Sequence, residues 1–459
     1  MSATSRSAAA LIALLLAAGA AAPGVAAAGF LDGMWESRKL ELGWRTMTYG
    51  SEPEGGERRD GRSFQQEARL ELGSRWSVGD NSFGLAAWAE AGTREDTYSQ
   101  AGYSAGLSRA DPERERGRRH LELNELYWIR SLGEVDLTLG RTVLRTGSAT
   151  LFSPADRLCP EDLTDPLEAR RLGVWLASLD WYRGDTVWTL AVVPLFSPAR
   201  LPAASSRWAI FPDLEIPAAF RVPEAAGFDP TNLPAEVDYP SGADAVQVLV
   251  RAKANLPGWD IFVAALRGVG HYPVLRSGSP GEGEGPLVQE YVPESVAAAG
   301  ASTTAGQFEF HGEAVARWSR GGRDDDCLTW VAGLTFTDAE TPRRLGLERL
   351  ELTVDYVGEE LLEQQDRAGY LAGTDIFRRR SRGVTARMTL TAGPDLAVGA
   401  LVTWNPGDGG RAWAPGLEYR LADGLTLRVA AEFLGGPADS LLGGWDRNDR
   451  LVTALRYAF

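Results

Sequence analysis

The sequence has very little lysine, and it has no long apolar segment beyond its first 28 residues. Only Lys39 and Lys253 are lysines, so arginine supplies nearly all of the 47 basic residues, against 62 acidic ones and a net charge of −15. No run of 18 apolar residues follows Ala28, which excludes a membrane-spanning helix from there on. Because phosphate binding needs clustered positive charge, an acidic chain without a basic block is a poor nucleic-acid partner.

Histidine is limited to His120, His271 and His311. A hydrolase would need a histidine near a nucleophile or an acid, and no serine motif accompanies any of the three. His311 alternates with Glu309 and Glu313, as expected of a residue on a polar wall. We therefore expect no enzymatic activity, no catalytic residue, no cofactor and no metal site.

Cysteine is limited to Cys159 and Cys327, which fits an oxidising compartment. A disulfide between them and two free thiols both remain open. Neither cysteine has a second Cys or His at ligand spacing, which disfavours zinc.

The first residues have the pattern of a secretory signal. Arg6 precedes an apolar run of 15 residues at 8–22, and Ala26–Ala28 offer a small-residue cleavage site. Such a run is too short for a comfortable membrane span. We predict a cleaved signal peptide at 1–28 and a mature domain at 29–459.

From residue 35 onward, apolar and polar residues alternate with a period of two. The alternation is clear at 39–45, 64–72, 308–317 and 425–433. Strands of soluble sandwiches are usually about five or six residues long, whereas a strand that crosses a bilayer needs about nine to eleven. The longer segments and their charged inner faces predict an all-β protein, a single transmembrane antiparallel β-barrel with a wet lumen.

Short and long connections alternate along the chain, as in outer-membrane barrels. Tight turns are predicted near 78–81, 131–134, 183–185, 256–258, 393–395 and 422–424, and long connections at 50–62, 94–118, 147–170, 196–243 and 270–286. An even count requires 288–299 to be a weak strand despite Pro293, which gives 18 strands, with 16 as the alternative. The strand at 119–131 has no single register.

The last residues, 451–459, also read as a barrel strand. Leu451, Leu455, Tyr457 and Phe459 share one face, opposite Arg456. A terminal Phe with an aromatic residue two positions earlier resembles the closing signal of outer-membrane barrels. We predict that the barrel-assembly machinery binds this strand, and that the protein lies in the outer membrane among lipid and lipopolysaccharide.

The segment from Ser153 to Arg171 is rich in proline and in charges of both signs. Prolines stiffen a loop, and mixed charge suits a polar lumen. One interpretation is a constriction loop, with Asp156, Arg157, Glu161 and Asp162 setting pore size and field. The other is a rigid loop on the surface.

This region also carries a family resemblance. The residues involved are Gly140-Arg141, Thr146-Gly147, 153–158, 160–163 and 171–175. They resemble a family of poorly characterised proteobacterial outer-membrane proteins, distantly similar to porins and alginate-export barrels. The resemblance continues through 312–314, 333–334 and the C-terminal strands, and it implies a large single-domain barrel. Cys159 and Thr146 depart from the pattern, where Asn and Trp are expected.

The acidic run Asp324-Asp325-Asp326 could hold Ca²⁺ or bridge lipopolysaccharide phosphates through a cation, but a solvated acidic turn is the favoured interpretation.

From these features we predict a porin-like channel for passive passage or export of small to medium polar solutes. A scaffold or adhesin barrel is the alternative, and a hydrolase is a weaker one. The predicted pore-lining residues are Arg45, Glu67, Arg69, Glu71, Arg75, Glu90, Arg251, Lys253, Glu309, His311, Glu313, Arg317, Arg387, Arg428 and Glu432.

Overall fold

The computed structural model describes residues 33–52, 60–93, 121–202, 206–208, 236–277, 287–344, 346–365, 370–371, 382–438 and 440–459. The predicted signal peptide and His120 lie outside these residues.

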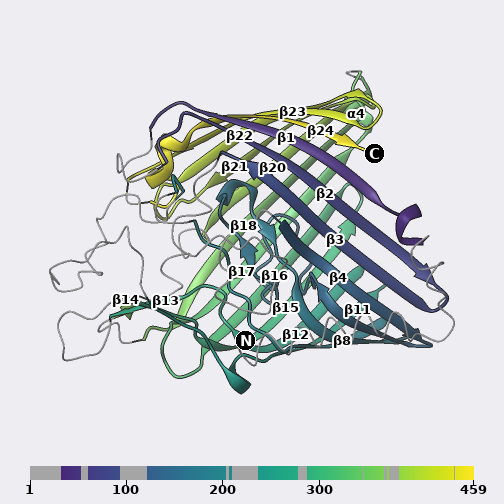
Figure 1. Ribbon diagram of the computed structural model, residues 1–459, viewed down its shortest axis with the longest axis vertical. Helices are drawn as coiled ribbons and strands as arrows, with labels where there is room; N and C mark the ends of the chain where they lie inside the picture. Colours follow the sequence, from purple (N-terminus) through teal and green to yellow (C-terminus); the bar gives the residue numbers. More distant parts are fainter. Residues whose placement is uncertain are drawn as a thin grey trace.

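Eighteen strands form one closed antiparallel sheet (Figure 1). β1 pairs with β2 on one side and with β24 on the other, where Trp44 lies opposite Leu455, so the barrel has no open edge. The predicted 18 strands are confirmed, and the alternative of 16 is wrong. The strands are β1 (Lys39–Tyr49), β2 (Phe64–Val78), β3 (Asn81–Gly92), β4 (Leu121–Leu132), β5 (Val135–Thr142), β8 (Val174–Arg183), β9 (Thr186–Val193), β11 (Gln247–Leu256), β12 (Trp259–Val269), β15 (Pro293–Ala305), β16 (Phe308–Ser319), β17 (Asp326–Asp338), β18 (Arg349–Glu363), β20 (Gly383–Ala392), β21 (Leu396–Trp404), β22 (Arg411–Ala422), β23 (Leu425–Gly435) and β24 (Arg450–Ala458).

The remaining elements are short. Four strands, β10 (Glu236–Asp238), β14 (Leu287–Glu290), β13 (Val274–Ser277) and β19 (Tyr370–Leu371), form a small separate sheet, and β6 (Glu161–Asp162) pairs with β7 (Arg170–Arg171). The short helices are η2 (Pro166–Glu168), η4 (Gly242–Asp244), η5 (Gly443–Asn448) and α4 (Glu340–Arg344). In the described part of the chain, no helix is both long enough and apolar enough to cross a membrane.

The outer face of the barrel carries exposed apolar and aromatic side chains. Trp44 is 48% exposed, Val263 59% and Phe433 43%, and cross-strand stacking joins Trp413 to Phe433. A closed sheet satisfies its backbone groups internally, and an apolar outer face suits hydrocarbon. The protein is therefore an outer-membrane β-barrel.

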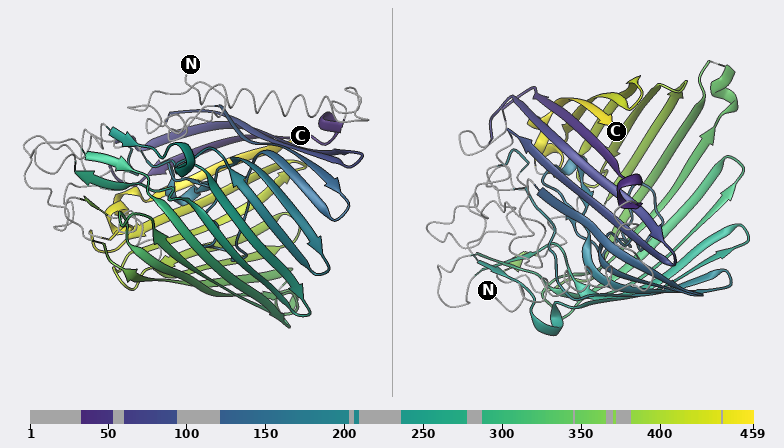
Figure 2. Two further views of the ribbon diagram at one scale, coloured as in Figure 1. Left: turned by 90° about the horizontal axis from the view of Figure 1, so that it is seen from below. Right: turned by 45° about the vertical axis from the view of Figure 1, so that its right-hand side comes forward.

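The two ends of the barrel differ. Two-residue turns join β2 to β3, β8 to β9 and β22 to β23. Long connections lie at the opposite end of the barrel (Figure 2). The predicted hairpin at 183–185 is confirmed, with Gly184 at a φ of +58°. Because short turns face the periplasm in such barrels, we refer to this end as the periplasmic end.

The barrel strand predicted at 288–299 exists as β15, but its bounds differ. β14 ends at Glu290 and belongs to the small separate sheet, and the barrel strand β15 begins only at Pro293. Proline has no N–H to donate, so the first position of a strand tolerates it.

The mixed register of β4 has a structural cause. Ala87 lies opposite Leu123 and Ala86 opposite Glu125, so Asn124 is an extra residue, a β-bulge. The bulge shifts the alternation by one, which places both Leu121 and Leu126 on the outer row.

Candidate functional site

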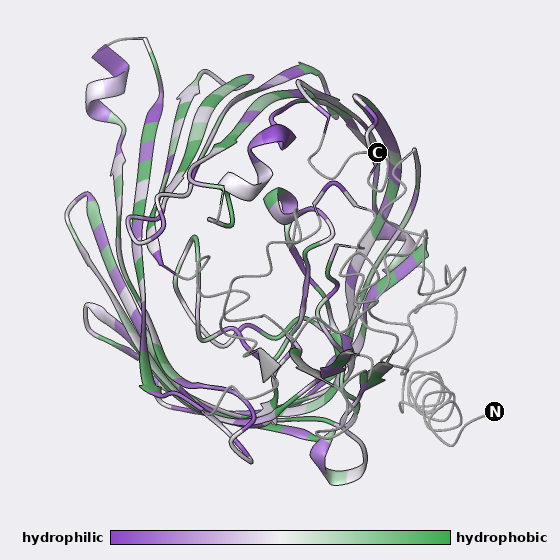
Figure 3. Cartoon of the chain, turned by 90° about the vertical axis from the view of Figure 1, so that its left-hand side faces the viewer, coloured by the Kyte–Doolittle hydropathy of each residue, from purple (hydrophilic) through white to green (hydrophobic). Residues whose placement is uncertain are grey.

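Two chain segments enter the lumen, and Figure 3 shows chain inside the ring of strands. We name residues 143–173, between β5 and β8, the inner loop. Residues 194–202 and 206–208, which follow β9, are named the strap. Leu158 and Cys159 of the inner loop pack on an apolar part of the wall, made by residues that include Leu249, Phe262 and Val315. The loop is thus held by hydrophobic burial as well as by charge.

A wall carboxylate holds the first half of the inner loop. Glu313 of β16 accepts hydrogen bonds from the backbone N–H of Ser148, from that of Ala149 at 2.6 Å and from the Ser153 hydroxyl at 2.7 Å, with the Ala155 N–H at 3.4 Å. These donors converge on one carboxylate that is 4% exposed. Charge-assisted bonds of this kind are about twice as strong as neutral ones.

Next to this contact, Asp355 of β18 accepts hydrogen bonds from the Leu151 N–H at 3.2 Å and from His311 Nε2 at 2.9 Å. Both His311 and Asp355 have fully buried side chains. His311 therefore positions a carboxylate that holds the loop.

A chain of ion pairs continues toward the extracellular end. Arg157 binds Glu294 of β15 through two bonds of 3.1 Å, and Arg317 lies 3.6 Å from Glu294 and 2.6 Å from Asp324. Burial opposes the charge of Arg157, but Glu294 more than offsets it and raises the pKa of Arg157 above its usual value. This chain ties the loop to β15, to β16 and to the connection that follows β16.

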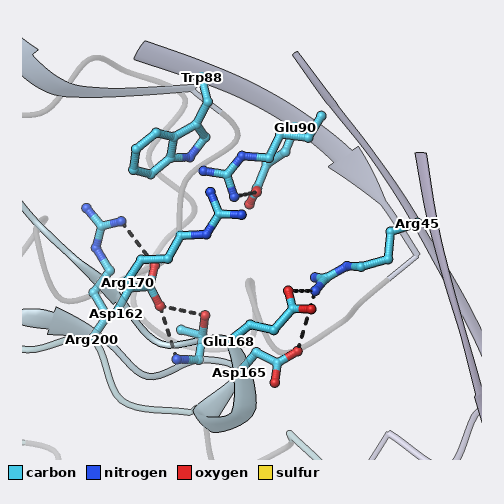
Figure 4. A pocket seen from close by; sticks show the side chains of 10 residues that line it. Arg45, Trp88, Glu90, Asp162, Asp165, Glu168, Arg170 and Arg200 are labelled. Atoms are coloured by element: carbon cyan, nitrogen blue, oxygen red, sulfur yellow. Dashed lines mark hydrogen bonds and ion pairs between the residues drawn. The ribbon is translucent and has the colours of Figure 1, made fainter. Parts of the chain in front are cut away.

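The turn at η2 reaches the strands that close the barrel. Asp165 accepts two bonds from Arg450 of β24, at 2.8 and 3.1 Å, and Arg450 also binds Glu432 at 2.5 Å. Glu168 pairs with Arg45 of β1 and lies 3.2 Å from an Arg428 nitrogen. Figure 4 shows Glu168 and Asp165 beside Arg45. The loop is thus fixed to both sides of the β1–β24 pair.

A buried glutamate on β4 binds the strap to the wall, and the strap in turn binds the loop. Glu122 lies 3.5 Å from Arg141 and 2.6 Å from Arg200 of the strap, and all three side chains are at most 1% exposed. Arg200 also lies 3.4 Å from Asp162 (Figure 4), and the Leu163 N–H donates to the Arg200 carbonyl at 2.8 Å. The two lumen segments therefore form one body.

The far end of the strap crosses to the opposite wall. Arg207 bonds to Asn448 at 3.0 Å and stacks over Tyr49 of β1, while Trp208 packs with Met47 and Trp445. Since the strap starts at β9, its described residues span the extracellular mouth.

His271 links the loop to the strap. Its ring nitrogens lie 2.8 Å from the Ser197 carbonyl and 2.9 Å from the Arg157 carbonyl. Burial lowers the pKa of His271 below its usual value. Neither His271 nor His311 bonds to a hydroxyl or thiol group among the described residues, so their contacts are those of structural residues.

The inner loop lies inside the barrel, so its interpretation as a surface loop is wrong. Its four candidate residues are all engaged. Asp156 accepts the Thr146 and Gly147 N–H groups at 2.6 and 2.9 Å, and Arg157 binds Glu294. The other two bind as follows: Glu161 accepts the Tyr272 hydroxyl at 2.9 Å, and Asp162 accepts the Thr164 hydroxyl at 2.7 Å. That these residues set the pore field stays a prediction.

The predicted pore-lining residues all fall on inward rows of the barrel. Most are paired: Arg45 with Glu67, Arg69 with Glu71 and Glu90, Arg75 with Glu125, Arg317 with Glu294 and Asp324, Arg428 with Glu168, and Glu432 with Arg450. His311 and Glu313 hold the loop as described. Arg251, Lys253, Glu309 and Arg387 form no ion pair with another described residue.

The acidic run is buried rather than solvated, which corrects the favoured interpretation. Asp324 binds Arg317, Asp325 accepts the Gln365 N–H at 2.9 Å, and Asp326 accepts the Ser319 N–H at 2.7 Å. The described residues contain no group of three or more His, Cys, Asp or Glu side chains placed to hold a metal ion. Arginine and backbone N–H groups occupy these carboxylates instead.

Of the two alternatives left open for the cysteines, the structure has the free thiols, because Cys159 and Cys327 are separate and buried. Cys159 lies 3.3 Å from the Leu144 N–H, and Cys327 accepts a bond from Arg317 Nε at 3.4 Å. Each cysteine is thus part of a different contact of the lumen.

The Cys159 thiol should report on loop docking. Burial raises the pKa of this thiol to about 11, so it stays protonated at neutral pH and gains reactivity only as the pH approaches that value. In a Cys327→Ser background, we expect almost no maleimide labelling at pH 7.5 in the native barrel and full labelling in urea. Rapid native labelling would contradict the packed loop.

The lumen is not filled evenly. A cavity of about 910 Å³ flanks the inner loop, and its lining includes Arg75, Arg145, Leu151, Phe152 and Glu359. Farther round the wall, inward residues from Thr385 of β20 to Arg420 of β22 are all at least partly exposed. No described residue of the loop or strap bonds to β20, β21 or β22. We name the inward face of these three strands the free wall.

Sequence reasoning missed Arg145 and His271 as lumen residues. Arg145 lies just before the segment chosen for its prolines, and its side chain is exposed to the cavity. His271 lies in a long connection that offers no pattern. The position of Arg145 at the end of a strand was a signal in the sequence that it could line the lumen. For His271 the sequence carried no such signal.

Comparisons with known proteins give distant structural likenesses. No family model matches the chain, and no curated protein matches it. It is similar to a mutant porin of Rh. blastica, with 10% identity and a TM-score of 0.39 over 92% of this chain and 99% of that one. It is also similar to OccK9 (OpdG) of Pseudomonas aeruginosa, with 13% identity and a TM-score of 0.45 over 93% and 99%. A third similar structure is a loop L8 deletion mutant of OmpT, an outer membrane protein of Vibrio cholerae, with 10% identity and a TM-score of 0.38 over 92% and 98%. The distant similarity to porins expected from the sequence is thus found.

Proposed function

We propose that this barrel is an outer-membrane channel for small polar solutes, and that solutes pass between the inner loop and the free wall. The observation that carries the proposal is the uneven filling of the lumen. The described residues of the loop and strap bond to inward residues of other walls, whereas the inward residues between Thr385 and Arg420 are all at least partly exposed and none of them bonds to a described residue of either segment.

The composition of the free wall supports a path for water and solutes. Small and hydroxyl side chains dominate it: Thr385, Thr389, Thr391, Ala397, Gly399, Thr403, Ala412, Ala414 and Gly416. Small side chains leave space between the wall and the loop, and hydroxyl groups replace the water contacts of a polar solute.

The anchoring of the inner loop supports a stable constriction. Ion pairs and N–H contacts fix it to β1, β15, β16, β18 and β24, so its edge facing the free wall has a defined position. A fixed edge gives a pore of defined size.

The test is single-channel conductance of the refolded barrel in a planar bilayer. We expect steady steps from the native protein and a clear reduction for Thr389→Trp, since Thr389 lies on the inward row of β20. Met388→Trp is the matched control, because Met388 is the adjacent outward residue, 43% exposed, and should leave the step unchanged.

Two outcomes would overturn the proposal. A correctly folded barrel without conductance would favour a scaffold or a duct that needs a partner. If the conductance steps of Thr389→Trp and the native protein are equal, solutes do not pass along the free wall. The proposal also includes export with cleavage of the signal peptide after residue 28, and binding of the C-terminal strand by the barrel-assembly machinery.

A further inference from the structure

The charges inside the barrel fall into two groups. In the first, arginines and carboxylates neutralise one another, as in Arg157–Glu294 and Arg450–Asp165. Glu313 belongs with them, because N–H groups and a hydroxyl occupy its carboxylate. Such charges hold the loop and contribute little net field to the remaining space.

The second group has no ion pair with any other described residue. At mid-lumen it contains cations, together with Asp180 of β8, which accepts the Thr189 hydroxyl at 2.5 Å in the same row as Arg251. Arg387 lies midway along β20 and is exposed, and Arg145 is exposed at the start of the inner loop. Arg251 of β11 donates to the Arg145 carbonyl at 2.7 Å and to the Thr189 hydroxyl at 3.3 Å, both uncharged acceptors.

Unpaired carboxylates lie nearer the periplasmic rim. Glu309 is the second residue of β16, and Glu418 is the fifth from the end of β22, with Arg420 two residues beyond it. The net charge of −15 therefore does not describe the middle of the lumen. Around Arg387 the adjacent inward residues, Thr353, Leu401 and Ala414, carry no charge, so the field beside the free wall is positive.

We infer that the channel prefers organic anions, and that Arg387 is the residue that sets this preference. The inference rests on the proposed function, since it concerns the same path. A guanidinium offers paired donors that match a carboxylate, and a narrow lumen with low-dielectric walls strengthens its field.

The residue opposite Arg387 narrows the class of anion. Leu401 of β21 lies directly across from Arg387 and is 39% exposed, while Thr353 of β18 lies on the other side. A leucine exposed on an inward row gives the carbon chain of a solute an apolar contact beside the charge. The pair therefore fits small carboxylates with a short apolar chain.

The test uses reversal potentials across a KCl gradient with the full barrel. We expect the native channel to favour chloride over potassium. Arg387→Glu changes the local charge by two units, which should lower the chloride-to-potassium permeability ratio by about tenfold and reverse the preference. Arg387→Lys should retain the sign. Arg343→Glu, on the exposed periplasmic helix α4, is the matched control and should leave the ratio unchanged.

A second measurement tests the apolar contact. With potassium acetate and potassium butyrate on opposite sides, Leu401→Thr should reduce the relative permeability of butyrate and leave the chloride preference intact. Arg145→Glu should shift the ratio in the same direction as Arg387→Glu.

The outcomes separate this inference from the proposed function. A silent bilayer overturns the channel itself. Steady steps with cation preference, or an unchanged ratio in a folded Arg387→Glu barrel, overturn only the role of Arg387. An unchanged butyrate permeability in Leu401→Thr overturns the carboxylate class.

Discussion

Replacing Glu313 with alanine is expected to release the first half of the inner loop and to enlarge the single-channel step. The substitution leaves the N–H groups of Ser148, Ala149 and Ala155 and the Ser153 hydroxyl without their common acceptor. At about 1 kcal/mol or more for each unsatisfied donor, the docked loop loses roughly 4 kcal/mol. A mobile loop should also produce current fluctuations that the native channel lacks.

Glu309→Ala is the matched control for this experiment. Glu309 lies on the same inward row of β16 but is exposed and makes no ion pair with a described residue. It should leave the step size nearly unchanged. Labelling of Cys159 gives an independent readout, since a released loop exposes that thiol. A folded Glu313→Ala barrel with native steps and a protected Cys159 would show that Glu313 does not hold the loop.

Replacing Arg450 with alanine is expected to destabilise the whole barrel. The Arg450 guanidinium is fully buried between Asp165 and Glu432, at 2.8 and 2.5 Å. Its removal leaves the buried Glu432 without its cation and weakens the neutralisation of Asp165, which keeps Arg45 at 3.9 Å, and this costs about 3–5 kcal/mol. Because β24 closes the barrel against β1, the loss should appear as a lower free energy of unfolding in a urea titration.

A control variant and a rescue variant show whether the loss of stability comes from the buried charges. Arg456→Ala, on the same strand, removes a side chain that is 48% exposed and 3.8 Å from Glu41, and it should change stability by less than about 1 kcal/mol. Adding Asp165→Asn and Glu432→Gln to Arg450→Ala removes the uncompensated charges and should restore part of the stability. Equal stability of Arg450→Ala and Arg456→Ala would contradict the role of the buried cluster.

The alternation of apolar and polar residues was sufficient to predict which side chains of the barrel wall face lipid and which face inward. Side chains in a strand alternate between faces, so the lipid-facing and inward rows could be read directly, as at Trp44 and Arg45. Even the failure of register in β4 carried information, because its two conflicting phases meet at the bulge residue Asn124. The strand predicted at 288–299 was found with other bounds, because β14 of the small sheet ends at Glu290, only three residues before β15 begins.

The contents of the lumen could not be read in this way. Asp156 and Asp162 looked like free charges of a constriction, yet N–H groups, a hydroxyl and Arg200 occupy them. Arg145 looked unremarkable and is one of the cations exposed to the lumen. The acidic run looked solvated and is buried against Arg317.

The sequence by itself determined the barrel and the direction of the side chains in its regularly alternating strands, because these depend on a period of two between neighbouring residues, and it narrowed the strand number to 18 or 16. Only the tertiary structure decided which charges are neutralised and which remain exposed to the lumen. The reason is distance along the chain: Asp165 and Arg450 are 285 residues apart, and Ser153 and Glu313 are 160 apart. No local pattern specifies such pairs, because closure of the barrel brings them together.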